Sequence, residues 1–220
     1  MTDATDSTAA RQPEGFSTSR LEAFSDGVFA IAITLLVLDL RVPEPDTLHG
    51  ESLVAALAYQ WPAYFAYLVS FLVIGIIWIN HHGMCVLADR VDRRTLFANL
   101  FLLLTVSVIP YPTRMLSAYL TAGHDDAHTA AALYAATMLA MGVAFSLLFL
   151  AFTRDARTLH HPIPPQALRA ALRRFGTGGL CYAATIGLAY VSPVAMLATH
   201  AALAVYYCFD QLAPARAASA

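Results

Sequence analysis

The stretch RLEAFSDGVFAIAITLLVLDL, residues 20–40, decides the fold. Between Asp26 and Asp39 it contains twelve uncharged residues in a row, most of them alanine, isoleucine, leucine or valine. A helix that crosses a bilayer needs about 20 mostly apolar residues, and charged side chains near its ends can reach the interface. The stretch therefore predicts a membrane-spanning helix with a polar entry around Arg20 and Asp26.

The rest of the chain has the same character. Of its 220 residues, 58% are hydrophobic and only 13% are charged, and the net charge is −2. Soluble domains contain about 45–50% apolar and about 25% charged residues, so the composition excludes an ordinary soluble domain and a disordered chain. It also offers no basic surface for nucleic acid. Three scattered cysteines exclude a disulfide framework or a paired-cysteine metal site.

Six segments are long and apolar enough to span a membrane: 20–40, 54–80, 96–116, 129–152, 175–191 and 193–212. Pro110 and Pro112 should kink or end the third of these helices, because proline breaks the helical hydrogen-bond pattern. We expect a flexible cytoplasmic tail over residues 1–19, one six-helix domain over 20–212, and a short cytoplasmic tail over 213–220. The expected fold is thus an all-α integral membrane protein.

The arginines predict the orientation of these helices. Eleven of the thirteen basic residues fall in the two tails and the second and fourth loops, and two fall in the first and third loops. The positive-inside rule therefore assigns both termini to the cytoplasm, as expected for a multi-pass protein of the cell membrane. The opposite loops are acidic, which would mildly concentrate cations there.

The carboxylate of Asp26 needs partners, because an aspartate inside the membrane costs about 2.5–3.5 kcal/mol on insertion scales. The second span runs in the opposite direction and ends in WINHH, residues 78–82, so its polar groups should lie at the same depth. The residues expected to bond to one another are Arg20, Ser25, Asp26, Trp78, Asn80 and His81. Such a cluster is either a structural clasp or a proton relay, and the helical geometry favours the clasp.

One face of the first helix carries a stripe of large apolar residues. At 100° per residue, Ile31, Thr34, Leu35 and Leu38 share a single face, and Asp26 points away from it. Periodicity alone assigns such a stripe to lipid contact or to a packed core, and nothing in the spacing makes it a pore.

The sequence lacks the motifs of other common functions. The sequence contains no nucleotide-binding loop and no HExxH motif. The glycines at 176, 178 and 179 are interpreted as a site of close helix packing rather than of phosphate binding. Histidines 124, 128, 160 and 161 are expected to be solvated loop residues, and His200 to be a hydrogen-bonded packing residue.

Residues 20–26 resemble the first-helix signature of the TMEM175 potassium-channel family, R-x-x-x-F-S-D, which is formed here by Arg20, Phe24, Ser25 and Asp26. Two further stretches agree with that family, namely WINH at 78–81, and Asn99 together with PYPT at 110–113. The resemblance covers about the first 115 residues.

The resemblance implies a homotetramer of six-helix units, in which the first helices line a central pore. By position, Ile31 is then the narrow apolar constriction, with Leu35 and Leu38 as further layers and Thr34 as the matching threonine. The implied function is passive, leak-type conduction of potassium, with the permeant ion in place of a cofactor and with membrane lipid and further copies of the chain as partners. The family lacks a TVGYG carbonyl filter, and so does this sequence.

Three other functions stay open. A secondary transporter usually contains repeats or interrupted helices, and no repeat is visible here. The channel could conduct protons as well. A membrane enzyme could use Asp26 and His81 as acid and base, but it lacks a nucleophile or a metal set, so we expect no enzymatic activity.

Overall fold

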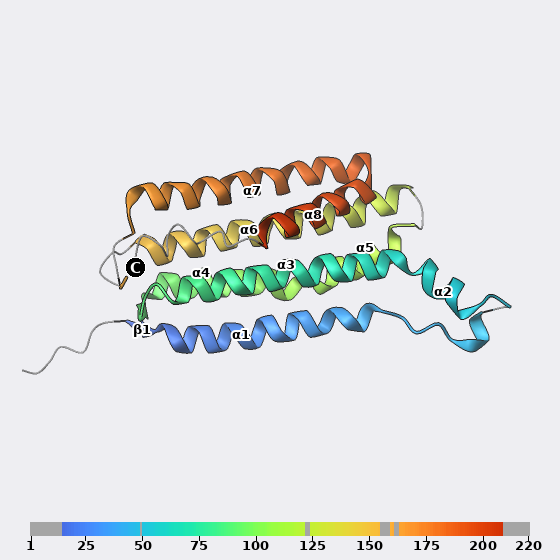
Figure 1. Cartoon of the computed structure of the whole chain (residues 1–220), viewed down its shortest axis with the longest axis horizontal. Helices are drawn as coiled ribbons and strands as arrows, with labels where there is room; N and C mark the ends of the chain where they lie inside the picture. Colours follow the sequence, from blue (N-terminus) through green and yellow to red (C-terminus); the bar gives the residue numbers. More distant parts are fainter. Residues whose placement is uncertain (1–14, 49, 122–123, 155–158, 161–162, 209–220) are drawn as a thin grey trace, which may run out of the picture.

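The computed structural model describes residues 15–48, 50–121, 124–154, 159–160 and 163–208. These residues are almost entirely helical, and the helices lie side by side along one long axis (Figure 1). The expected tail at 213–220, most of the expected tail at 1–19 and His161 lie outside the described residues.

Two short strands hold the start of the first helix. Strand β1, Phe16–Ser17, pairs antiparallel with β2, Arg90–Val91, and helix α1, Thr18–Leu35, follows directly. The prediction of a flexible tail up to residue 19 is therefore wrong for residues 16–19. Helix α1 continues into a 3₁₀ turn, η1, Leu36–Asp39, so the whole apolar stretch is helical.

The second apolar segment is divided, which corrects the expected single helix from 54 to 80. A short helix α2, Leu53–Tyr59, follows the 3₁₀ turn η2, Pro45–Thr47, and α3 runs over Trp61–Cys85. The break falls at Gln60, and Pro62 lies in the first turn of α3, where proline is tolerated. Helix α2 buries no residue and lies beyond one end of the bundle (Figure 1).

The third segment is interrupted at its first proline, as expected. Helix α4, Arg93–Val108, ends just before Pro110, and α5, Pro110–Tyr119, begins there. Asp92 caps the start of α4, because its carboxylate accepts the Thr95 backbone N–H at 2.8 Å.

The last three helices form the far side of the bundle. Helix α6 covers His124–Arg154, α7 covers Pro165–Val191 and α8 covers Pro193–Tyr207. The turn between α7 and α8 lies at Ser192, whose hydroxyl accepts the Ala195 N–H at 3.2 Å. Neither His124 nor His128 is a loop residue as expected, because α6 begins at His124. The ring nitrogen of His128 donates to the Ala189 carbonyl at 2.6 Å.

The layers run from α1 through α3, α4 and α5, then α6 and α8, to α7 on the opposite side (Figure 1). Four stretches are long and apolar enough to cross a membrane: Thr18–Asp39, Trp61–Cys85, Arg93–Tyr119 and Asp125–Arg154. The core between the layers is closely packed, and its largest fully buried side chains include Phe29, Tyr134 and Phe149. We refer to the two ends of the bundle as the β1 end and the α2 end.

Candidate functional site

The two faces of α1 differ in their surroundings. The inner face packs against α3 and α4, and its buried residues are Thr18, Leu21, Ser25, Phe29 and Ala32, followed by Leu36 in η1. The outer face carries large apolar side chains that are exposed, among them Phe24, Ile31 and Leu38. This arrangement divides one apolar helix into a side that builds the fold and a side that is left available.

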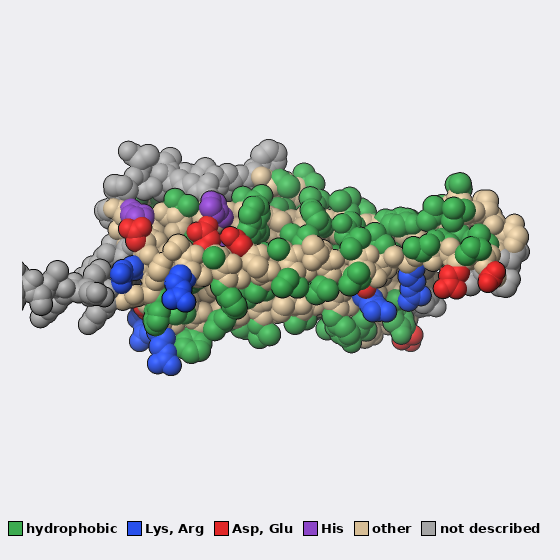
Figure 2. Space-filling view, turned by 90° about the horizontal axis from the view of Figure 1, so that it is seen from below, with side chains coloured by type: hydrophobic (Ala, Val, Ile, Leu, Met, Phe, Trp, Pro, Cys, Tyr) green, Lys and Arg blue, Asp and Glu red, His purple; other side chains and the backbone are tan. Residues whose placement is uncertain are grey.

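The stripe expected from the helical periodicity lies on the outer face. Ile31 is 61% exposed, Leu35 43% and Leu38 74%, and Thr34 is exposed between them. Residues in a 3₁₀ turn repeat every three positions, which keeps Leu38 in line with Leu35 after the α-helix ends. Figure 2 shows this side of the molecule, where charged side chains gather at the two ends and the middle stretch carries none.

Thr34 is the one hydroxyl residue among these apolar side chains. Its hydroxyl donates to the backbone carbonyls of Ala30 and Ile31, both at 3.0 Å. The hydrogen is thus engaged within the helix, and the oxygen lone pairs stay available on the outer face.

Asp26 and Glu22 connect α1 to α3 at the β1 end. The indole N–H of Trp78 donates to the Asp26 carboxylate at 2.8 Å. His82 and Glu22 form an ion pair one turn nearer the β1 end. Both acidic residues therefore have a partner on α3, the helix whose WINHH stretch the sequence indicated.

A second chain of hydrogen bonds crosses from α1 through α4 to α3. The Asn99 side-chain amide donates to the Ser25 hydroxyl at 3.0 Å, and its oxygen lies 2.8 Å from Nε2 of His81. The other ring nitrogen of His81 lies 3.7 Å from the Cys85 sulfur. Ser25, His81 and Asn99 are at most 2% exposed, so their bonds replace those that water would make.

Two members of the expected cluster lie outside it. The Asn80 amide donates to the Ile76 carbonyl of its own helix at 2.8 Å. Arg20 is exposed, and its guanidinium makes no hydrogen bond or ion pair with any residue that the structure describes. Phe24 is also exposed, at 58%, on the outer face of α1. Asn99, the centre of the buried chain, was missing from the expected cluster.

The α2 end of α1 is held by a different set of contacts. Asp39 and Arg114 lie 3.7 Å apart and connect η1 to α5. Next to this contact, the Ser70 hydroxyl lies 2.8 Å from the Thr113 hydroxyl and 3.0 Å from that of the fully buried Tyr134. The stretch that follows α1 is therefore connected to α5, and beside this contact buried hydroxyls join α3, α5 and α6.

Asp26 and His81 do not form an acid–base pair with each other. Nδ1 and Nε2 of His81 face Cys85 and Asn99, and Asp26 bonds to Trp78. No cluster of three metal-ligating side chains occurs within the described residues. The arrangement instead presents a continuous apolar surface with one hydroxyl, supported from behind by buried hydrogen bonds.

Comparisons with known proteins show similarity to potassium channels. Residues 20–110 match the family model described as "Endosomal/lysosomal potassium channel TMEM175". A potassium channel of Streptomyces collinus is 49% identical over 202 residues, which cover 91% of this chain and 97% of that protein. The crystal structure of a lysosomal potassium-selective channel TMEM175 homolog from Chamaesiphon minutus superposes with a TM-score of 0.78 at 35% identity, covering 88% of this chain and 97% of that one.

A chicken relative carries a different name. The endosomal/lysosomal proton channel TMEM175 of Gallus gallus is 32% identical over 154 residues, which cover 67% of this chain but only 30% of that longer protein.

Proposed function

The chain belongs to the TMEM175 family, and on that basis we propose that it is a potassium channel of the leak type, which conducts the ion passively. Similarity to a potassium channel over almost the full length of both chains supports this function. The single structural observation that carries it is the outer face of α1, where Ile31, Leu35 and Leu38 stand exposed in one line.

The pore requires several copies of the chain. Helix α1 is an outer layer of the bundle (Figure 1), so its outer face cannot enclose a passage within one subunit. We propose a homotetramer in which four α1 helices surround the axis and turn this face inward. The family resemblance of residues 20–26 supports the number four.

The proposed topology has six membrane crossings, with the β1 end in the cytoplasm. Helices α7 and α8 supply the fifth and sixth crossings. The six-helix domain covers residues 20–212, and the tails before and after it are cytoplasmic. The arginine-rich loops at the β1 end support this orientation in the cell membrane.

Ile31 forms the narrowest ring in this proposal. Four aliphatic side chains on an axis offer an ion nothing in exchange for its water, so a narrow ring blocks by dewetting. Leu35 and Leu38 then form wider layers toward the α2 end, and the Thr34 oxygen is the nearest polar group to the ring. The buried chain from Ser25 through Asn99 to His81 acts as a structural clasp, because it fixes the rotation of α1 about its own axis.

Proton conduction is a second candidate, since the chicken relative is named a proton channel. The half-buried carboxylate of Asp26 is a titratable group on α1 that could take part in it. A proton current would follow the pH gradient when potassium is equal on both sides.

Flux from liposomes that contain only this protein tests the proposal. A potassium gradient should drive a current without any second substrate, and its reversal potential should follow potassium rather than sodium. A flux that needs a counter-substrate would identify a transporter instead. A purified particle with one or two copies and full activity would contradict the tetrameric pore.

A further inference from the structure

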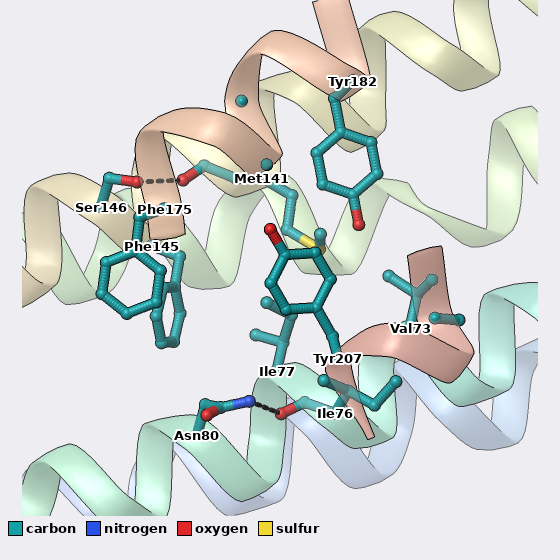
Figure 3. A pocket seen from close by; sticks show the side chains of 14 residues that line it. Val73, Ile76, Ile77, Asn80, Met141, Phe145, Ser146, Phe175, Tyr182 and Tyr207 are labelled. Carbon is teal, nitrogen blue, oxygen red and sulfur yellow. Dashed lines mark hydrogen bonds between the residues drawn. The ribbon is translucent and has the colours of Figure 1, made fainter. Parts of the chain in front are cut away.

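A small cavity lies away from α1, where α3, α6, α7 and α8 face one another (Figure 3). Its volume is about 50 Å³, and its walls are mainly apolar, with Val73, Ile77, Met141 and Phe145 among them. A cavity needs about 10–15 Å³ to hold one water molecule, and a water in the liquid takes up about 30 Å³. The space therefore suits one or two waters.

The Tyr182 hydroxyl is a buried polar group in the wall of this cavity. Tyr182 is only 7% exposed, and it extends from α7 toward Tyr207 of α8 (Figure 3). Its hydroxyl makes no hydrogen bond with any residue that the structure describes. Burying a hydroxyl in apolar surroundings without a hydrogen bond is unfavourable, and ordered water commonly bonds to such groups. The hydroxyl thus indicates a polar ligand in the cavity.

Two further side chains offer oxygen atoms to the same space. The Asn80 amide nitrogen donates to the Ile76 carbonyl at 2.8 Å, which leaves the amide oxygen as an acceptor. The Tyr207 hydroxyl donates to the Arg174 carbonyl at 3.3 Å, and its oxygen keeps lone pairs that can accept. Together with the Tyr182 hydroxyl, these atoms supply the two to four polar partners that a buried water requires.

The surrounding helices hold Tyr182 beside the open space. Its ring packs against the His200 ring at a centroid distance of 5.4 Å, and His200 donates to the Met196 carbonyl at 3.0 Å, as expected of a hydrogen-bonded packing residue. A side chain at Gly142 would lie 3.4 Å from the Tyr182 ring, so glycine leaves room for the ring there. A side chain at Gly179, also in the cavity wall, would meet no atom within 4 Å, which keeps the space open beside α7.

We propose that this cavity is a water-binding site inside the bundle, where one or two ordered waters bond to Tyr182, Tyr207 and Asn80. The waters connect α7 and α8 to α3, at the position directly before His81 of the buried chain. Asn80 lies in the last two turns of α3, and Tyr207 is the last residue of α8. The cavity is therefore near the β1 end, from which water has a short way to enter.

X-ray hydroxyl-radical footprinting of the full chain in lipid nanodiscs tests the site. Radiolysis of a bound water produces radicals in place, and mass spectrometry measures how fast each side chain near it is oxidised. Met141 lines the cavity and Met138 lies one turn away on α6, and both are at most 1% exposed, so radicals from bulk water reach both equally little. We expect Met141 to be oxidised several times faster than Met138, and Tyr182 faster than the fully buried Tyr134.

Tyr182→Phe removes the hydroxyl that anchors the water. The oxidation of Met141 should slow by up to about fivefold, the factor that corresponds to the ~1 kcal/mol of one hydrogen bond. Tyr190→Phe is the matched control, because Tyr190 lies on the same helix and is 65% exposed, and it should leave the Met141 rate unchanged. An unchanged Met141 rate in Tyr182→Phe would contradict the proposed site.

Gly179→Leu fills the cavity and should lower the oxidation rate of Met141 to that of Met138. Gly187→Leu is its control, because Gly187 lies outside the cavity on the same helix and a side chain there meets no atom within 4 Å. Equal rates for Met141 and Met138 in the wild type, or the same Met141 rate in both leucine variants, would overturn the proposal. The measurement involves no ion flux, so its outcome does not depend on the proposed channel function.

Discussion

The inner and outer faces of α1 are almost equally apolar, yet only one of them builds the subunit. The inner face alternates large and small residues, with Phe29 between Ser25 and Ala32, and all three are at most 1% exposed. The outer face carries large aliphatic side chains at Ile31 and Leu38 that no neighbour within the subunit covers. Hydropathy finds the helix but does not distinguish these faces.

The difference follows from the energetics of a membrane. Lipid tails are as apolar as leucine, so burying an aliphatic side chain between helices gains little, and close packing with interhelical hydrogen bonds decides which surfaces associate. The inner face has both features, since Ser25 bonds to Asn99 on α4 and the Phe29 ring packs against the tilted His81 ring at a centroid distance of 5.5 Å. The outer face shows neither feature among the described residues, which leaves it available for the proposed passage between copies.

The largest effect is expected from Phe29→Ala on the inner face. The variant leaves a cavity beside His81, and phenylalanine-to-alanine changes at buried positions cost about 3–5 kcal/mol. Phe24→Ala on the outer face is the control and should cost less than about 0.5 kcal/mol, because Phe24 is 58% exposed. Thermal unfolding of both variants in the same detergent measures the difference. Similar losses for the two would show that the outer face is as tightly packed in the assembled protein.

Asn99→Ala should have the next largest effect. It removes the donor to the Ser25 oxygen and the partner of His81 Nε2, while the Ser25 hydroxyl still donates to the Leu21 carbonyl; the loss of these buried bonds costs about 1–3 kcal/mol. Ser107→Ala is the matched control on the same helix, since the Ser107 hydroxyl is exposed and donates only to the Leu104 carbonyl. Unfolding midpoints and the fraction of assembled particles report the effect. If the Asn99→Ala protein is as stable as the control, the hydrogen bonds of Asn99 do not hold the inner face in place.

The contrast between the faces was largely predictable, while the partners of the inner face were not. Because α1 is regular from Thr18 to Leu35, a 100° wheel suffices to align Ile31, Thr34 and Leu35. The contact between Asp26 and Trp78 follows from two antiparallel helices that meet at one depth. The bond from Asn99 to Ser25 joins residues 74 positions apart, and no local pattern fixes how far α4 slides along α1.

Helix boundaries were missed where composition conceals backbone geometry. Residues 53–79 are apolar almost throughout, so the break at Gln60 was overlooked although Pro62 is a signal for a new helix start. The pairing of β1 with β2 involves two residues in each strand, which is too short for any periodicity. The polar residues around His128 are typical of a loop, whereas its bond to the Ala189 carbonyl depends on tertiary contact with α7.

The cap at Asp92 gives a smaller effect that depends on pH. Asp92 starts α4, which holds Asn99 against the inner face. The Thr95 backbone N–H holds the pKa of the Asp92 carboxyl below its usual range. A carboxyl whose pKa is lower in the folded state stabilises the fold above its unfolded pKa, and this contribution is lost as the pH falls through the folded pKa.

Asp92→Ala should therefore cost about 0.5–2 kcal/mol at neutral pH, and Asp92→Asn much less, because asparagine caps helices about as well. The difference in the free energy of unfolding between the wild type and Asp92→Ala should become smaller in acid. Unfolding midpoints measured from neutral pH to below pH 4 test this order. If this stability difference does not change with pH, the ionised carboxylate of Asp92 is not its source.

Ile31→Asn should disturb folding least of all, and it tests what the outer face does. The side chain is 61% exposed in the subunit, so the unfolding midpoint should change by less than the equivalent of about 0.5 kcal/mol. In the proposed tetramer the same change admits water and amide groups to the narrowest ring, which should raise conductance and weaken the preference for potassium over sodium.

Leu38→Asn is the matched variant at a wider and more exposed level, and it should change selectivity less. Single-channel current and reversal potential, with potassium on one side and sodium on the other, measure both variants against the wild type. Unchanged selectivity in a stable Ile31→Asn tetramer would move the selective level to Thr34, whose oxygen lone pairs face outward one turn along the helix. A large loss of stability in the same variant would instead mean that Ile31 packs against a neighbouring subunit, and the outer face of α1 would then be an assembly surface rather than a pore lining.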